Sequence, residues 1–258
     1  SNYSQEFDIN STTFDNSSSA STLLAGGEGM VDSHDHDGGF SETTTASFSA
    51  DFAVAAEEGG SEAVQAYYGF QIDLNTSFTG EDSLDISLDA GNGGGAAGEF
   101  DLNSTSDALK VDGVAYTFPI GDKTTVFVGD NMDGSTLYST ACVYGGPSNT
   151  LDDCGNASSA LGDVSGTAAG ASYDIGSGFT AAVGYSGAGS STAGLATKEG
   201  SDAIGAQLTY TADSYGASVT YGNIETSDDD RNYWGLNGYW TPSESGSVPS
   251  VSVGYEMG

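Results

Sequence analysis

The stretch Tyr68-Gly-Phe-Gln-Ile-Asp-Leu-Asn-Thr-Ser-Phe-Thr79 alternates apolar and polar residues, and Leu84-Asp-Ile-Ser-Leu-Asp-Ala90 resumes the alternation after Gly80-Glu-Asp-Ser83. A period of two is typical of a β-strand with two unlike faces, and Gly, Asp and Ser are typical of turns. The sequence therefore predicts a β-hairpin here. In a soluble sheet the apolar face would enter a core, whereas in an outer-membrane barrel it would face lipid and the polar face would line a wet interior.

The rest of the chain predicts further strands of the same kind. Short links alternate with longer ones, which is typical of an outer-membrane barrel with turns at one end and loops at the other. We therefore expect an all-β protein with an antiparallel β-barrel of outer-membrane type, incomplete or fragmentary if the strands are too few. The further strands are predicted at residues 43–54, 109–118, 124–128, 168–174, 179–185, 203–210, 216–221, 233–240 and 248–255.

Three regions follow from this pattern. Residues 1–42 are predicted to be a loop-rich N-terminal segment with short strands around Phe7 and Ile9. Residues 43–258 form the predicted barrel region, and residues 130–166 form a long loop within it, whose length indicates an ordered functional loop or one surface of the barrel. The chain starts at Ser1 without the pattern of a signal peptide, so we expect a processed chain or a piece of a longer one.

The composition is strongly acidic. The chain has 37 Asp and Glu against 4 Lys and Arg, for a formal net charge of -33. Nucleic acid is therefore not expected as a partner, because phosphate binding needs clustered basic residues. A field of this sign would attract cations. The alternative interpretation of most of these carboxylates is a solvated acidic surface.

The two cysteines, Cys142 and Cys154, lie close together in the predicted long loop. They do not have the spacing of a zinc site, so a disulfide that closes a short loop is expected, together with an oxidising compartment. Two free thiols in a cytosolic loop are the alternative.

Several segments resemble the barrel region of cyanobacterial outer-membrane porins, especially those of marine picocyanobacteria. The resemblance covers roughly residues 43–258, and its most specific parts are Ser77-Phe-Thr-Gly-Glu-Asp82 and Tyr116-Thr-Phe-Pro-Ile-Gly-Asp122. It implies a large antiparallel barrel, a preceding domain that binds cell-wall polymer, and passive passage of small solutes or inorganic ions. The wall-binding domain is not in this sequence, the predicted strands are fewer than the usual 16 to 18, and the chain ends on Gly258 rather than on an aromatic residue.

The sequence contains no recognisable catalytic motif, and we do not expect an enzyme. No cofactor is predicted, although calcium is considered for acidic clusters whose carboxylates suit that ion, with His34 and His36 as ligands for a transition metal. The alternative for each cluster is a solvated loop or turn. These weak metal candidates are Asp32, His34, Asp35, His36, Asp37, Asp130 and Asp133, and Asp228-Asp-Asp230 is a similar weak candidate for calcium.

The polar positions of the first strands are predicted to line a pore with cation preference, because rings of carboxylates favour cations. These positions are Asp51, Gln71, Asp73, Asn75, Asp85 and Asp89. The predicted function is an outer-membrane porin for small hydrophilic solutes or inorganic cations, in contact with outer-membrane lipid and forming a homo-oligomer. The alternative is an extracellular β-rich structural subunit of a surface layer, tube or filament, stabilised by calcium, for which the same polar face would be the solvated outside of a sheet.

Overall fold

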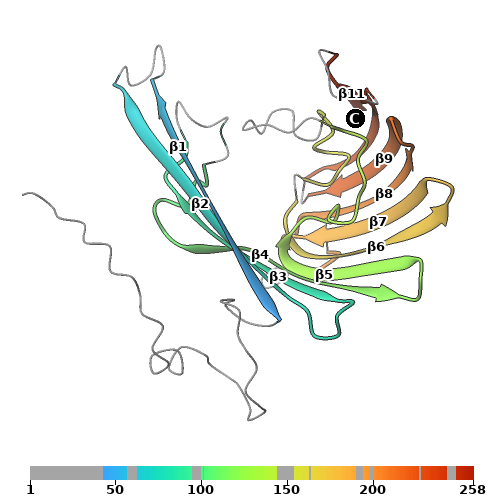
Figure 1. Cartoon of the computed structure of the whole chain (residues 1–258), viewed down its shortest axis with the longest axis horizontal. Coiled ribbons are helices and arrows are strands. Elements are labelled where there is room, and N and C mark those ends of the chain that lie inside the picture. Colours follow the sequence, from blue (N-terminus) through green and yellow to red (C-terminus); the bar gives the residue numbers. More distant parts are fainter. Residues whose placement is uncertain are drawn as a thin grey trace, which may run out of the picture. The chain divides into compact units, whose positions relative to one another are not determined.

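The strands of this protein form one antiparallel sheet in which every strand pairs with the next one along the chain (Figure 1). The computed structural model describes residues 43–56, 63–94, 100, 102–143, 154–162, 164–189, 194–197, 200–226, 228–242 and 248–258. The predicted all-β antiparallel fold is thereby confirmed. The eleven strands are β1 (Thr44–Ala55), β2 (Gln65–Thr76), β3 (Ser83–Gly91), β4 (Lys110–Ile120), β5 (Thr124–Met132), β6 (Gly166–Gly176), β7 (Phe179–Gly187), β8 (Asp202–Thr211), β9 (Tyr215–Glu225), β10 (Asp230–Trp240) and β11 (Val251–Met257).

The sheet has two outer strands. Among the described residues, β1 pairs only with β2, and β11 pairs only with β10. All eleven strands belong to the unit formed by residues 39–258. In the same part of the chain there is no helix long and apolar enough to cross a membrane.

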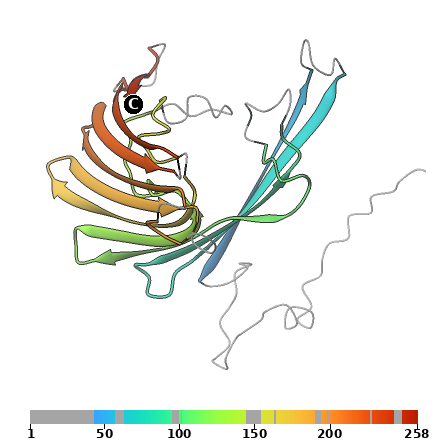
Figure 2. The ribbon, with the colours of Figure 1, turned by 180° about the vertical axis from the view of Figure 1, so that it is seen from behind.

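The links at the two ends of the strands differ in length, as the sequence pattern predicts. Tight turns at residues 121–123, 177–178 and 212–214 join strands at one end. At the other end, long links span residues 92–109 and 133–165. The rule has two exceptions, because the β9–β10 link is short and the β10–β11 link, on the turn side, spans residues 241–250. The reverse view in Figure 2 shows the same succession of strands.

The boundaries of the first hairpin are not where the alternation places them. Phe78 was expected on a strand, but β2 ends at Thr76, and Phe78 lies in the turn, 68% exposed. The cause is Asp82, whose Oδ1 accepts hydrogen bonds from the backbone N–H of Phe78 (3.0 Å) and of Thr79 (2.7 Å). A carboxylate that captures local N–H groups offers the backbone an alternative to the strand ladder.

Two other predicted boundaries also shift. Pro119 and Ile120 were expected in a link but belong to β4, where Pro119 pairs with Thr125. The long loop was expected to begin at Asp130, but β5 continues to Met132 and β6 already starts at Gly166.

The two faces of the sheet keep their character from strand to strand. In the register, Phe48 lies opposite Ile72, and Ile72 lies opposite Leu88. The same face continues across the whole sheet to Leu236 and Tyr255, which pair with each other on β10 and β11. The opposite face carries mainly Gly, Ser, Thr, Asn, Gln and Asp. Because one slip in register would exchange the faces, the pairing is strongly specified.

The best-buried apolar side chains lie on the polar face, beneath the β5–β6 link. Leu161, Val164, Ala203 and Ile224 form a buried cluster. Phe127 is also fully buried. The β5–β6 link therefore supplies half of this cluster, and it is part of the folded structure of the sheet.

Candidate functional site

The polar face of β1–β3 brings together the residues that the sequence predicts to line a pore. Asp51 pairs with Gly69, Gln71 with Asp89, and Asn75 with Asp85. All of the predicted positions have the same strand parity, opposite to that of the apolar residues. This set consists of Asp51, Gln71, Asp73, Asn75, Asp85 and Asp89.

Neutral side chains hold two of these carboxylates in place. Gln71 Nε2 donates to Asp73 Oδ1 at 2.8 Å, and Ser87 Oγ donates to the same oxygen at 2.7 Å. Asn75 Nδ2 donates to Asp85 Oδ1 at 2.5 Å. Hydrogen bonds from neutral donors fix a carboxylate without cancelling its charge, so the acidic positions of β1–β3 present a negative field.

Basic residues are scarce on this face. Lys110 of β4 lies opposite Asp89 in the register. The described salt bridge joins Arg231 of β10 to Asp229 of the β9–β10 link at 2.6 Å. Asp229 accepts that hydrogen bond from Arg231, which lowers the pKa of its carboxyl group.

Some of the predicted metal candidates lie among the residues that the structure describes, namely Asp130, Asp133 and Asp228-Asp-Asp230. Asp32, His34, Asp35, His36 and Asp37 lie outside the described residues. Asp130 Oδ1 accepts from Thr167 Oγ1 at 2.9 Å, and Asp133 Oδ1 accepts from Ser135 Oγ at 2.8 Å. Within the described ranges, no three His, Cys, Asp or Glu side chains are grouped so that they could hold a metal ion.

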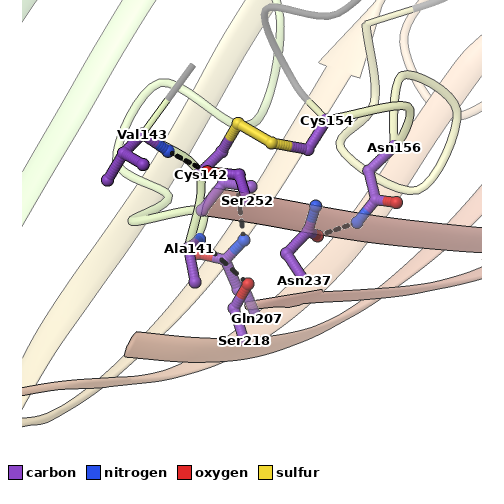
Figure 3. Close-up of a disulfide and its surroundings, with 10 residues drawn as sticks. Ala141, Cys142, Val143, Cys154, Asn156, Gln207, Ser218, Asn237 and Ser252 are labelled. Atoms are coloured by element: carbon purple, nitrogen blue, oxygen red, sulfur yellow. Dashed lines mark hydrogen bonds between the residues drawn. A yellow bond between two sulfur atoms is a disulfide. The ribbon is translucent and has the colours of Figure 1, made fainter. Parts of the chain in front are cut away.

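The polar face of β7–β11 is covered by the link between β5 and β6. We call residues 133–143 the outgoing arm and residues 154–164 the return arm. The outgoing arm crosses the strands in order, and at residues 139, 141 and 143 it donates its backbone N–H to a side chain of the sheet; Figure 3 shows the bonds of Ala141 and Val143. These bonds are Ser139 N to Gln207 Oε1 at 2.7 Å, Ala141 N to Ser218 Oγ at 3.0 Å, and Val143 N to Ser252 Oγ at 2.9 Å.

The amide of Gln207 is the centre of this network. Its Oε1 also accepts from Thr209 Oγ1 at 3.1 Å, and its Nε2 donates to Thr140 Oγ1 and to Thr220 Oγ1, both at 3.0 Å. Gln207 is buried, and so are Thr209 and Thr220. Buried polar groups are tolerated when they are hydrogen-bonded in this way.

The return arm crosses the same strands in the reverse direction. Ser159 N donates to Glu256 Oε2 on β11 at 2.6 Å, and Asn156 Nδ2 donates to Asn237 Oδ1 on β10. Leu161 then lies over Gly205 of β8. Both arms therefore contact the sheet along most of their described length.

A row of glycines lets the arms approach the sheet so closely. Gly170, Gly184, Gly205 and Gly222 are direct cross-strand neighbours on β6 to β9. A Cβ atom added at Gly184 would lie 1.7 Å from the carbonyl oxygen of Gly134, inside any allowed contact. At Gly222 the added atom would lie 2.9 Å from the carbonyl oxygen of Ser159. Gly184, Gly205 and Gly222 are therefore required by packing against the link, whereas a Cβ at Gly170 would meet the ring of Phe127 on β5 at 2.6 Å.

A disulfide joins the two arms where they cross β11. The structure bonds Cys142 to Cys154, as the sequence predicts, with their Cα atoms 6.0 Å apart (Figure 3). The Cys154 carbonyl oxygen lies against Gly254 of β11, since an added Cβ there would be 1.9 Å away. The bond thus closes the far end of the covering link.

One phenol is buried beneath the outgoing arm. The hydroxyl of Tyr138 lies over Gly205 and has no hydrogen-bond partner among the described atoms. Burial raises the pKa of this phenol, and the charge of Asp133 raises it further. Tyr138 is therefore neutral, and it packs as an apolar ring against the cluster around Leu161.

A second link folds onto the polar face at the other side of the sheet. The backbone of Leu102, in the β3–β4 link, lies against Gly69 and Gly91, where an added Cβ would be 2.7 Å and 2.2 Å from it. Asn103 Nδ2 donates to the Phe70 carbonyl oxygen at 3.0 Å. This contact covers the loop ends of β2 and β3, where Asp89 is also buried, whereas Asp73 and Asp85, nearer the turn, are half-buried.

The exposed apolar face has aromatic side chains near both ends of its strands. On the turn side, the rings of Phe179 and Tyr210 are 4.8 Å apart, and those of Tyr210 and Tyr215 are 6.0 Å apart. On the loop side, Tyr221 and Trp234 are 5.0 Å apart. Tyr215 and Tyr221 are six residues apart on β9, which is roughly 20 Å along a strand. Outer-membrane barrels carry two such girdles around an apolar band that is about 25 Å tall.

Asp82 organises the turn between β2 and β3. Tyr116 OH donates to its Oδ2 at 2.7 Å, and Ser77 Oγ and Thr79 Oγ1 donate to its Oδ1. The hydrogen bond from Tyr116 is the largest cause of a lowered pKa of the Asp82 carboxyl group, and the donors of Thr79 and Ser77 add to it. The carboxylate form therefore holds this turn together.

Sequence reasoning found the acidic face and the cysteines but missed the anchoring residues of the covering link. Gln207 and Ser218 look like ordinary polar positions of an alternating strand, and the glycine row looks like a general richness in glycine. The recurrence of glycine at one register position on four successive strands was the available signal, and it becomes visible only when the strands are aligned.

Comparisons with known proteins add little to this picture. No protein-family model matches the chain, and no curated protein sequence was found to be similar to it. Among solved structures, the chain is similar to a loop L8 deletion mutant of OmpT, an outer membrane protein of Vibrio cholerae, at 13% sequence identity and a TM-score of 0.38. The alignment covers 83% of this chain and 82% of that protein. A similarity at this level carries no argument about function.

Proposed function

We propose that this protein is a porin-like component of an outer membrane, through which small hydrophilic solutes and inorganic cations diffuse passively. The observation that carries the proposal is the unbroken apolar face of the sheet. The large apolar side chains of this face are exposed instead of being packed against other parts of the protein: Phe48 is 74% exposed and Phe52 is 81% exposed. Contiguous apolar surface on this scale marks a lipid or protein contact, because water disfavours it.

The distribution of polar groups supports lipid as that contact. The apolar residues and the aromatic pairs share one face, and the carboxylates of β1–β3 share the other. In an aqueous sandwich or barrel the apolar face would be the buried one, but here the buried polar groups, such as Gln207 and Thr220, lie on the opposite face. This inverted arrangement is the pattern of barrels that are apolar outside and polar inside.

Cation preference follows from the charges of β1–β3. Asp73, Asp85 and Asp89 lie on one side of one hairpin, and carboxylates lining a narrow wet space attract cations and repel anions. The polar face of β7–β11 contributes mainly neutral hydroxyl and amide groups, and the carboxylate of Glu256 on β11 is engaged by the backbone N–H of Ser159.

The test is to fold the full chain in detergent, reconstitute it in planar bilayers, and measure the reversal potential across a salt gradient. A cation-selective pore gives a potential of the sign expected for cation flow. A chain that is monomeric without detergent, or one that is correctly folded but forms no channels, would contradict the proposal.

The second candidate is an extracellular structural subunit, and one observation favours it. Within the described residues the outer edges of β1 and β11 have no strand beside them. An open edge can pair with another chain, and it cannot remain exposed within lipid. Regular assembly in detergent-free buffer would support this second function.

A further inference from the structure

A small pocket lies at the turn end of β3 and β4. Its volume is about 320 Å³, at the lower end of the range for small-molecule sites. The residues that line it are Thr79, Glu81, Asp82, Tyr116, Phe118 and Pro119. The pocket therefore combines aromatic rings and two carboxylates in a space that suits a small ligand.

The aromatic rings of this pocket are part of a cluster. The ring centroid of Tyr116 lies 5.5 Å from that of Phe118, with 27° between the ring planes, and 6.2 Å from that of Phe78. Tyr116 pairs with Leu84 in the register, so these rings belong to the apolar face near its turns. The faces of aromatic rings carry partial negative charge and attract a cation that lies over them.

The carboxylate of Asp82 is buried beside the rings and keeps its charge. Its Oδ1 accepts four hydrogen bonds from groups of the turn, and its Oδ2 accepts the one from Tyr116 at 2.7 Å. All of these donors are neutral, so they stabilise the charge without cancelling it. The pKa of this carboxyl group is lowered, mainly by the hydrogen bond from Tyr116.

Glu81 adds a second carboxylate on the solvent side of the pocket. Glu81 is exposed, and within the described part of the chain neither Glu81 nor Asp82 forms an ion pair. A metal ion would need a shell of several oxygen ligands, and the described acidic residues form no such group. The aromatic lining favours instead a cation whose own surface is apolar.

We propose that this pocket binds a quaternary ammonium group, with Tyr116 and Phe118 against its methyl groups and Glu81 and Asp82 as its counter-charges. Such a group carries its positive charge on a surface of methyl groups and has no N–H to satisfy, so it fits a site that is both aromatic and negative. The site goes beyond the proposed pore and does not depend on ion conduction. In the proposed membrane the turn end of the strands lies at the level of the headgroups. A choline headgroup of a lipid and free choline are therefore two sources of the same chemistry.

The experiment titrates choline chloride into the full chain, folded in a non-ionic detergent, and follows binding by calorimetry. The control ligand is the neutral isostere of choline, a dimethylbutanol with carbon in place of the charged nitrogen. Choline is expected to bind, and the neutral alcohol should bind about tenfold more weakly because it lacks the charge.

Two variants test the two parts of the site. Phe118→Leu removes a ring but keeps apolar volume, and Glu81→Gln removes an exposed charge; each should weaken choline binding about fivefold. The matched control is Phe179→Leu, in the ring pair with Tyr210 outside the pocket, and it should bind choline as the wild type does. Because Glu81 is exposed, Glu81→Gln keeps the test valid even if Phe118→Leu lowers stability.

A short-chain lipid, dihexanoylphosphatidylcholine below its micelle concentration, distinguishes the two sources. It should bind more tightly than choline if the site takes a headgroup, because its chains reach the apolar face, and no more tightly if the site takes the free ligand. Absence of choline binding to the folded chain, or equal binding of choline and the neutral alcohol, would overturn the inference whether or not channels form. A chain that binds choline but forms no channels would lose the pore and keep this site.

Discussion

The polar face of β1–β3 and the polar face of β7–β11 are built from the same strand geometry but are put to different uses. The first carries carboxylates held by neutral donors such as Gln71 and Asn75. The second carries glycines, hydroxyl groups and the amide of Gln207, and it is covered by the β5–β6 link. Most of the carboxylates therefore lie where the β5–β6 link does not cover the face, while close approach and mainly neutral hydrogen bonds occur where chain packs on chain.

The largest expected effect comes from filling the glycine row. Gly184→Val places side-chain atoms where the Gly134 carbonyl now lies, so the outgoing arm cannot seat on β7. Overpacking of this kind costs about 1–3 kcal/mol, and occasionally more. We expect a clear fall in the temperature at which the folded form is lost on heat-modified gel electrophoresis.

The matched control is Gly238→Ala, on β10. An added Cβ at this strand glycine would have its nearest neighbour at 3.5 Å, an ordinary contact. This variant should keep a thermal transition close to that of the wild type. An equal loss in both variants would mean that the glycines matter for strand formation in general and not for seating the link.

The next effect concerns selectivity. Changing Asp73, Asp85 and Asp89 together to Asn keeps the size and polarity of these side chains and removes their charge from the polar face of β1–β3. Reversal potentials should lose their cation preference in dilute salt and change less in concentrated salt, where the Debye length is only about 3 Å at 1 M.

Asp130→Asn is the control for selectivity. This carboxylate has the strand parity of Val128, on the apolar face, and should not affect a pore on the other side. If the triple variant keeps full cation preference in dilute salt, the polar face of β1–β3 does not select ions.

Another variant tests the polar face of β7–β11. Gln207→Leu removes an amide that makes four hydrogen bonds and leaves the N–H of Ser139 without its acceptor. The hydroxyl of Thr220, which is buried, also loses its hydrogen bond from Gln207, and a buried polar group without a partner costs about 1–3 kcal/mol. Heat-modified electrophoresis should show a loss of stability, and the reversal potential of the open channel should not move, because no charge has changed. A shifted reversal potential would show that the polar face of β7–β11 also contributes to ion selectivity.

The smallest effect is expected at the turn between β2 and β3. Because the folded state lowers the pKa of Asp82 below its ordinary 3.8, the turn gains stability above that pH and loses it as the pH falls towards the lowered value. Asp82→Asn should remove this acid sensitivity, which can be followed by proteolysis of the turn at graded pH. A wild-type turn that is equally protected on both sides of this range would contradict the role of the carboxylate.

Much of the fold could be predicted from the sequence, because alternation specifies strands and the identity of the faces. The hairpin of Leu74 and Ile86, the shared side of the acidic residues and the bonded pair of cysteines all follow from local pattern. The turn around Asp82 could not be placed, because a side chain that captures backbone N–H groups overrides the alternation.

The covering link could not be predicted for a different reason. Its anchors are distant in sequence: Val143 is 109 residues from Ser252, and Ser159 is 97 residues from Glu256. No local pattern encodes such pairs. Single glycines in strands are also ambiguous, and only the register of β6–β9 shows that four of them form one row.

The span of the covering link also has a consequence for the order of folding. The arms cross β7 to β11, so their binding surface does not exist until those strands have paired in register. Bringing the arms to strands about 100 residues further along the chain has an entropic cost, and this cost arises before the contacts between the arms and the sheet can compensate for it. The disulfide, in contrast, joins residues only 12 apart in sequence. A chain that oxidises early would therefore carry a preformed ring to the sheet, and the seating of that ring would be the last and slowest event of folding.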